Sequence, residues 1–337
     1  MTAGLPLRQM QQLARDASDA GFSGLVITEA GRTAYLSCAA AALAADIDVL
    51  TGIAVAFPRS PTVTATVAWE LADVSAGRFR LGLGTQVRAH IERRYGTEFD
   101  PPGPRMREYV GALRSIFAAF RGESDLDHDG QFWKLSLLPA MWSPGPIDVV
   151  DPPIDIAAVN PWMLRLAGEV ADGVHVHPLN TPTYLSETVL PNLSAGAARA
   201  GRTLAELEVI VPVFVAPGVT PEERSEWREM ARMQVAFYGS TPNYAFIFDQ
   251  LGRAGTTARI RERQKIGDIA GMAAQIDDEL LAEFCVAGDW PTVADRLADR
   301  YESVATRIVL YAAGAAWARD PTSLTRGGEI ARALGSK

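Results

Sequence analysis

Strand-like and helix-like segments alternate along almost the whole of this 337-residue chain. Short apolar runs bounded by turn residues predict strands, and longer segments with helical spacing predict the helices between them. Seven strands are predicted, at residues 25–28, 48–54, 79–83, 154–157, 173–176, 209–216 and 306–311. The helices are predicted at 6–20, 34–45, 61–72, 87–95, 105–120, 161–171 and 183–200. Alternation of this kind favours a mostly parallel sheet covered by helices.

Two excursions interrupt the alternation. Residues 122–150 contain an Asp129-Gly130 turn signal followed by a proline-rich run, and we expect this segment to cover the carboxyl ends of the strands. Residues 221–300 form a second, helical excursion, with one helix predicted at 277–284. Its last helix is predicted at 290–301, where Asp289 is the cap and a proline lies in the first turn.

Composition and charge exclude several classes of protein. The net charge of −8 argues against general binding to nucleic acid. We expect no membrane span, because no run of about 18 apolar residues is present, and the N-terminal segment does not resemble a secretion signal. Cys38 and Cys285 lie outside any metal-binding spacing, so they are expected to be reduced core thiols of a cytoplasmic protein without a metal site.

The segment from Leu71 to Gly96 carries the strongest local signal. Residues 79–83 form a short apolar run, as expected of a buried strand. Gly82 and Gly84 allow the backbone to approach a ligand closely. The strand is followed by two hydrogen-bonding side chains, Thr85 and Gln86. Ligands of parallel α/β folds bind at the carboxyl ends of the strands, so this loop is a candidate binding site.

Two other interpretations of this loop remain open. A dinucleotide-binding loop of the Rossmann type needs a third glycine, and this chain has Val87 at that position. A glycine-rich turn that binds nothing also accounts for the local residues.

Several segments together resemble one family. They are AGFSGLVITE at 20–29, TGIAVAFPRSP at 51–61, LGLGT at 81–85, PPIDIAAVNPWMLRLAGEVADGVHVHP at 152–178 and DDELLAEFCVAGDWPTVADRLADRY at 277–301. They are similar to segments of the luciferase-like flavin and deazaflavin oxidoreductases, and most like an actinobacterial branch that uses coenzyme F420. The resemblance implies a single (β/α)8 barrel domain of the bacterial-luciferase type over residues 1–337. Its first strand should be short or missing, because residues 1–5 are too few and too weakly apolar to form a full strand.

The resemblance also implies an activity. We expect an F420-dependent oxidoreductase that transfers a hydride between the deazaflavin and an organic substrate, and that forms a homodimer. Two acid–base groups of related sugar-phosphate and alcohol dehydrogenases are absent, because this chain has Ala30 and Val87 at their positions. The alternatives are an FMN-dependent monooxygenase of the same superfamily and a non-catalytic F420-binding protein, and the two missing groups point to the latter.

Glu29 and His177 are the candidate catalytic residues. Glu29 follows a short apolar strand, where its carboxylate could hold the cofactor ring or act as a general base; a solvated or capping role is equally open. His175 and His177 alternate along one strand and are expected to project to the same side. His177, nearer the carboxyl end, is the candidate for contact with substrate or cofactor, whereas packing remains the default for both.

Asn160 and Pro161 are typical of a helix start, since Asn is a preferred cap and Pro suits the first helical position. The free N–H groups of such a helix form an anion site. Together with the resemblance, this predicts that Ala158, Val159 and Asn160 bind the cofactor phosphate. An ordinary capped helix without a ligand is the alternative.

The resemblance further implies a non-proline cis peptide at Gly52-Ile53, in a bulge at the end of the third barrel strand. In similar proteins this bulge backs the middle of the tricyclic cofactor ring. Gly52, Ile53 and Ala54 are accordingly predicted to contact the cofactor, together with Gly84, Thr85 and Gln86. An ordinary trans strand is the alternative.

Overall fold

The computed structural model describes residues 1–311 and 321–335. The chain divides into two compact units. The first comprises Met1–Ala158, Trp162–His175 and Leu193–Glu208. The second comprises Val159–Pro161, Val176–Asn192 and the described part of Val209–Lys337.

Parallel strands form the centre of the first unit. They are β1 (Thr2–Ala3), β2 (Gly24–Thr28), β3 (Asp48–Thr51), β4 (Ala54–Val55), β5 (Phe79–Gly84) and β8 (Ile154–Ala158), followed by β9 (Gly173–Val176). The order is β1-β2-β3-β5-β8, with β4 paired to β5. The first strand is thus present and two residues long, with Thr2 opposite Ile27, which confirms the expectation of a short strand.

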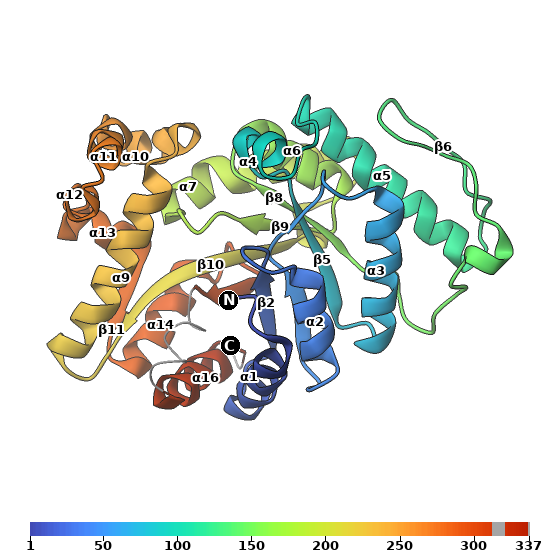
Figure 1. Cartoon of the computed structure of the whole chain (residues 1–337). Coiled ribbons are helices and arrows are strands. Elements are labelled where there is room, and N and C mark those ends of the chain that lie inside the picture. The colour runs from blue at the N-terminus through green and yellow to red at the C-terminus, as the bar shows by residue number, and fades with distance from the viewer. Residues whose placement is uncertain (312–320, 336–337) are drawn as a thin grey trace. The chain divides into compact units, whose positions relative to one another are not determined.

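Helices pack beside these strands (Figure 1). They are α1 (Leu7–Ala20), α2 (Ala34–Ala42), α3 (Pro61–Val74), α4 (Arg88–Arg93), α5 (Pro102–Arg121) and α6 (Pro161–Val170). Phe79, Leu81 and Leu83 of β5 are fully buried, as the apolar run predicted. The alternate residue Gly82 makes room for its neighbours, because a Cβ atom there would lie 2.0 Å from the carbonyl oxygen of Thr51.

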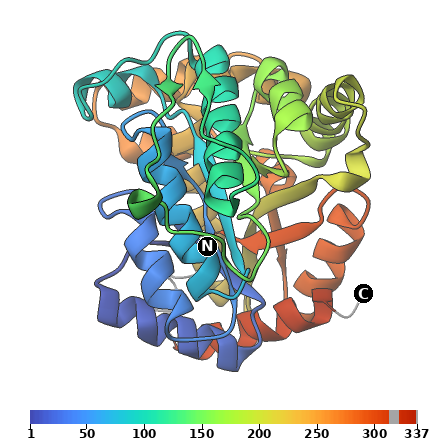
Figure 2. The same cartoon turned by 90° about the vertical axis from the view of Figure 1, so that its right-hand side faces the viewer.

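The excursion at 122–150 packs along α3 and α5 (Figure 2). The hairpin strands β6 (His128–Asp129) and β7 (Lys134–Leu135) are antiparallel, as the turn signal predicted. Farther along, Trp69 Nε1 on α3 donates to the carbonyl of Gly145 over 3.0 Å. Arg121 on α5 donates to the carbonyl of Ile147 over 2.6 Å. The second half of this segment therefore lies along the outer helices α3 and α5 and not over the carboxyl ends of the strands, contrary to the expectation. Its aromatic and carbonyl groups find their partners on the outer helices.

The second unit contains β10 (Glu208–Pro217) from Val209 onward, β11 (Cys285–Gly288) and β12 (Arg307–Leu310). Both shorter strands pair in parallel with β10, β12 with its first half and β11 with its end. The helices are α7 (Pro182–Tyr184), α9 (Pro221–Gly239), α10 (Ala245–Gln250), α11 (Thr256–Lys265), α12 (Ile269–Ala273), α13 (Asp278–Phe284), α14 (Trp290–Tyr301) and α16 (Pro321–Gly335), while α8 (Leu190–Arg199) runs across the boundary of the units. Asp289 caps α14, accepting from the Thr292 N–H over 2.9 Å.

The region 221–300, predicted as helical, also contains a strand between the predicted helices at 277–284 and 290–301. β11 interrupts the helices with four residues, which are too few for an alternating pattern to stand out between two helical segments. The backbone of Phe214–Pro217 supplies the pairing that makes this run a strand. In the part of the chain that the structure describes, no helix combines the length and apolar character needed to cross a membrane.

Candidate functional site

A backbone bulge lies at the carboxyl end of β3. β3 stops at Thr51 and β4 begins at Ala54, and the peptide bond between Gly52 and Ile53 is cis, as expected. The N–H of Gly52 donates to the carbonyl of Ile27 over 2.9 Å, which ties the bulge to β2. Gly52 has little free space, since a Cβ atom there would lie 2.2 Å from Cγ1 of Val26.

Ile53 packs on the glycine of the neighbouring strand. A Cβ atom on Gly84 would lie 2.6 Å from Cδ1 and 2.7 Å from Cγ1 of Ile53. Val55 pairs with Gly84, and Ala54 pairs with Leu83. The structure thus brings four predicted cofactor residues, Gly52, Ile53, Ala54 and Gly84, into one small region.

Thr85 and Gln86 follow Gly84 directly. Gln86 is exposed and has a φ of 56°, in the left-handed region that non-glycine residues seldom adopt. Thr85 Oγ1 donates to the carbonyl of Gln86 over 3.1 Å. Both side chains therefore lie on the loop after the strand, as predicted, and their contact with a cofactor stays a prediction.

The Glu29 carboxylate is held within the protein. Its Oε2 accepts from the backbone N–H of Val55 over 2.8 Å and from Nη1 of Arg59 over 2.9 Å, and its Oε1 accepts from Nη2 of Arg59. The Glu29 side chain is only 5% exposed. Burial lowers the pKa of Arg59, but the hydrogen bonds and charge of Glu29 outweigh it and raise that pKa. Glu29 is therefore the buried partner of an ion pair with the partly exposed Arg59, and its predicted role as a base stays a prediction.

The residues of the Glu29–Arg59 ion pair bind the backbone of the bulge at Ile53 and at Val55. Arg59 Nη1 also donates to the carbonyl of Val55 over 3.0 Å, so Val55 is bound through its N–H by Glu29 and through its carbonyl by Arg59. The N–H of Glu29 donates to the carbonyl of Ile53 over 3.4 Å. The sequence offered no signal for Arg59, because its partner lies thirty positions away.

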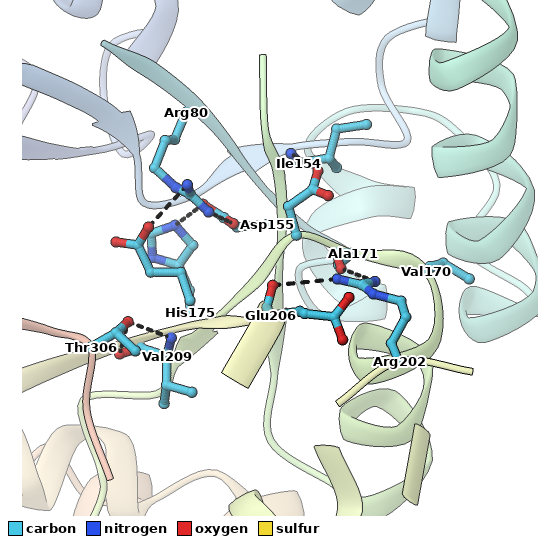
Figure 3. A network of polar contacts seen from close by, with 12 residues as sticks. Arg80, Ile154, Asp155, Val170, Ala171, His175, Arg202, Glu206, Val209 and Thr306 are labelled. Atoms are coloured by element: carbon cyan, nitrogen blue, oxygen red, sulfur yellow. Dashed lines mark hydrogen bonds and ion pairs between the residues drawn. The ribbon is translucent and has the colours of Figure 1, made fainter. Parts of the chain in front are cut away.

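A second charged cluster lies inside the first unit (Figure 3). Arg80 on β5 donates from Nε to Asp155 Oδ2 over 3.0 Å, and its Nη1 lies 2.9 Å from Glu208 Oε2. Asp155 is fully buried. Burial raises its pKa to about 6, against the opposing hydrogen bonds and charge of Arg80. His175 Nε2 lies 3.9 Å from Asp155 Oδ2, so His175 belongs to this cluster.

Sequence reasoning missed the partners of this cluster. A signal was present, because Arg80 and Asp155 are single charges within apolar strands that pair side by side. Glycine makes space for the cluster, since a Cβ atom on Gly173 would lie 2.5 Å from Asp155 Oδ1. His175 similarly occupies the space over Gly82, where a Cβ atom would lie 2.4 Å from its Nε2.

His177 lies among tyrosines in the second unit. Its ring centroid is 4.7 Å from that of Tyr238 and 4.4 Å from that of Tyr244. The hydroxyls of Tyr238 and Tyr311 share a short hydrogen bond. The backbone N–H of Leu179 donates to His177 Nδ1 over 3.0 Å. In the neutral imidazole the proton is therefore on Nε2, which makes that nitrogen a donor. Burial lowers the pKa of His177 to about 3, so the neutral form prevails at neutral pH.

The predicted phosphate-binding residues lie at the start of α6. This helix begins at Pro161, so Asn160 precedes its first residue, as the sequence predicted. In the second unit the buried Tyr184 donates from its hydroxyl to the carbonyl of Val159 over 2.6 Å. Ala158 is the last residue of β8 in the first unit. The binding of phosphate by Ala158, Val159 and Asn160 stays a prediction.

The chain is similar in sequence to proteins of one family. The family model described as luciferase-like monooxygenase matches residues 1–307. Uncharacterized protein Rv1360 of Mycobacterium tuberculosis is 39% identical over 305 residues, covering 88% of this chain and 90% of that protein. The 5,10-methylenetetrahydromethanopterin reductase of Archaeoglobus fulgidus is 27% identical over 311 residues, covering 89% and 88%.

Solved structures share the fold. The coenzyme F420-dependent tetrahydromethanopterin reductase of Methanopyrus kandleri has a TM-score of 0.76 at 21% identity, over 97% of this chain and 95% of that one. An F420-dependent secondary alcohol dehydrogenase with a bound F420-acetone adduct has a TM-score of 0.73 at 15% identity, over 98% and 96%. A Baeyer-Villiger monooxygenase of Pseudomonas putida in complex with FMN has a TM-score of 0.65 at 19% identity, over 96% and 90%.

These similarities confirm the predicted fold, the luciferase-like barrel with a mostly parallel sheet. The family match covers far more than half of the chain, and a relative above 30% identity covers most of it. The chain belongs to the luciferase-like monooxygenase family and is an oxidoreductase of that family.

Proposed function

We propose that this oxidoreductase uses coenzyme F420 to move a hydride between the deazaflavin ring and a small organic substrate. The observation that carries the proposal is the bulge at Gly52–Ala54, where Ile53 packs on Gly84 beside the carboxyl end of β5. Relatives that are named as F420-dependent, a reductase and an alcohol dehydrogenase, support F420 over FMN.

The residues of the bulge fit a planar ring. Ile53 offers an apolar, partly accessible side chain, and no side chain on Gly84 competes for the same space. When bound, the deazaflavin supplies a two-electron hydride carrier. Ile53 would back the ring, while Thr85 and Gln86 would donate and accept hydrogen bonds at its polar edge. The Glu29–Arg59 pair would keep the bulge in place.

Residues of the second unit have separate proposed roles. Val159 and Asn160 would bind the cofactor phosphate through backbone N–H groups at the start of α6. His177 would donate a hydrogen bond from Nε2 to a bound ligand, because Nδ1 is already occupied by the N–H of Leu179.

Titration of the purified chain with F420 and with FMN, followed by tryptophan fluorescence, tests the proposal. We expect saturable quenching by F420 at micromolar concentration and much weaker quenching by FMN. Stronger binding of FMN would overturn the choice of cofactor. Tight binding of F420 without turnover of any member of a substrate panel would identify a non-catalytic F420-binding protein.

A matched pair of glycine variants tests the bulge. Gly84→Ala places a Cβ atom against Ile53, so we expect the F420 dissociation constant to rise about tenfold or more. Gly111→Ala is the control, because it lies in α5 and its nearest contact at that position is 3.8 Å away. Equal affinity in both variants would locate the ring elsewhere.

A further inference from the structure

The second unit holds a cavity that contains none of the residues predicted to bind cofactor or substrate. Its volume is about 440 Å³. The elements around it are α9, α13, β11 and α14, which contact one another within this unit (Figure 1). Arg228 comes from α9, Cys285 and Val286 come from β11, and Arg296 and Arg300 come from α14, one helical turn apart.

The guanidinium groups of Arg296 and Arg300 are bound by carbonyl oxygens rather than by carboxylates in direct contact. Arg296 donates to the carbonyl of Ala287, and Arg300 donates to the carbonyls of Ala282 and Glu283. Within residues 1–311 and 321–335, neither arginine has a carboxylate within 4.0 Å. The carbonyl partners fix the two side chains without forming ion pairs with them, and Asp289 interacts with the charge of Arg296 only at longer range.

Arg228, the third arginine of the cavity, shares the carboxylate of Asp278 with Arg232. Arg228 Nη2 lies 2.9 Å from Asp278 Oδ1, and Arg232 Nη2 lies 2.6 Å from the same oxygen. The positive charge of the neighbouring arginines acts on Cys285 in the wall of the cavity. Burial raises the pKa of that thiol to about 12, while Arg228, Arg300 and Arg232 oppose the shift by favouring the thiolate.

The remainder of the lining is apolar. Leu281, Ala282, Val286 and Ala287 complete the wall. Cavities that hold small ligands have volumes of about 300–1,000 Å³, so this one is large enough for a small molecule. Guanidinium groups match the geometry of carboxylate and phosphate oxygens and bind them through two parallel hydrogen bonds.

We propose that this cavity binds a small organic oxyanion, a phosphate or carboxylate group attached to a short apolar body. Arg296, Arg300 and Arg228 would hold the oxyanion, and the apolar wall at Leu281 and Val286 would contact its body. The proposal is independent of the proposed F420 chemistry, because it uses other residues.

Ligand-observed NMR titrations of the full chain without cofactor test the proposed oxyanion site. A salt concentration of about 0.15 M screens nonspecific electrostatic attraction. Phenyl phosphate and benzoate are the anionic probes, and benzyl alcohol is the neutral probe of similar size. We expect saturable binding of at least one anion and weaker binding of the alcohol. Binding of phenyl phosphate alone or benzoate alone supports the proposal and identifies the head group.

Three charge-neutralising variants make the test specific. Arg296→Gln and Arg300→Gln should each weaken anion binding about tenfold, because each removes a charge-assisted hydrogen bond. Arg15→Gln removes the same charge from an exposed position on α1 and should leave binding unchanged. Arg300 contacts the end of α13, so circular dichroism must show that Arg300→Gln is folded. If Arg300→Gln is not folded, Arg296→Gln alone tests the proposal, because Arg296 is exposed.

Absence of saturable anion binding at millimolar concentration would overturn the proposal. An equal loss of binding in Arg15→Gln, or equal binding of benzyl alcohol, would overturn it as well. The fluorescence titration with F420 should be unchanged in Arg296→Gln. Failure of the anion proposal can therefore be distinguished from failure of the proposed use of F420.

Discussion

Arg59 is the residue whose importance emerges only from its contacts. It neutralises the Glu29 carboxylate, which is almost completely buried, and it binds the Val55 carbonyl. Removing one partner of such a pair leaves a buried charge without compensation, which costs more than the pair itself contributes.

We expect Arg59→Met to lower the free energy of unfolding by about 2 kcal/mol, less than for a fully buried pair because Arg59 is partly exposed to solvent. Urea denaturation measures this change. Adding Glu29→Gln to Arg59→Met should recover part of the loss, since it removes the uncompensated charge. A single variant as stable as the wild type would show that the ion pair contributes nothing.

Glu29→Gln alone separates two roles of this residue. The amide oxygen can still accept from the Val55 N–H. If Glu29 only positions the bulge, the variant should therefore bind F420 modestly more weakly and lose turnover by a similar factor. A general base would instead lose turnover at full F420 affinity. Comparing the F420 dissociation constant with the rate at saturation distinguishes the two.

His177 should make stability depend on pH. Its folded-state pKa, about 3, lies below the ordinary value of 6.5, so the unfolded chain binds the proton more readily. This contribution to stability is complete above about pH 6.5 and is lost as the pH falls, by about 2 kcal/mol at about pH 5. His177→Asn keeps an acceptor for the Leu179 N–H and cannot titrate.

Urea denaturation of wild type and His177→Asn between about pH 7.5 and pH 5 checks this expectation. Asp155 acts in the opposite direction, because burial raises its pKa to about 6 and its contribution is lost as the pH rises through that value. The difference between the two proteins, rather than the wild-type curve, therefore reports on His177. Parallel curves would contradict the expectation.

At the scale of elements, the hairpin β6–β7 depends on one side chain of α5. The Glu108 carboxylate accepts from the backbone N–H groups of Gln131, Phe132 and Trp133 over 2.8, 2.7 and 2.7 Å. Tyr109 packs edge-on against Trp133 with centroids 5.3 Å apart. The carboxylate thus organises a turn that lies more than twenty residues away in the sequence.

Glu108→Ala should release this turn. Each lost hydrogen bond to a charged acceptor is worth about 1.5–3 kcal/mol locally, although solvent replaces part of it. We expect faster amide hydrogen exchange at 131–133 and little change at the buried strand β5. Glu108→Gln, which keeps one acceptor oxygen, should be intermediate. Unchanged exchange at 131–133 would show that other contacts hold the hairpin.

At the scale of the whole molecule, the resemblance predicts a homodimer. On α2 of the first unit, Leu36 is 57% exposed, and Leu43 directly after the helix is 68% exposed. Clusters of exposed large apolar side chains are typical of surfaces that bind another protein. Val63 on the neighbouring helix α3 is 54% exposed as well.

Light scattering after size exclusion measures the mass of the assembly. We expect a dimer for the wild type and a monomer for the double variant Leu36→Glu and Leu43→Glu. Leu137→Glu is the control, because Leu137 is 80% exposed in the segment at 122–150. A monomeric wild type, or dissociation by the control alone, would contradict the use of α2.

The sequence by itself determined most of the order of strands and helices. Apolar runs, glycines and helix caps act locally, so Phe79–Gly84, the start of α6 at Pro161 and the cap at Asp289 were all predictable. The family resemblance added the barrel, the bulge after Thr51 and the cis bond at Gly52-Ile53. These features depend on neighbours in the chain or on a shared ancestral pattern.

Only the tertiary structure decided which charges meet. Whether Glu29 binds Arg59, or Arg80 binds Asp155, depends on which strand ends lie side by side and in which register. The strand β11 likewise exists because β10 offers it a pairing edge. Burial then sets the chemistry, since the same carboxyl or imidazole titrates normally in water and is shifted when desolvated. Such effects arise from neighbours distant in sequence, which no local pattern encodes.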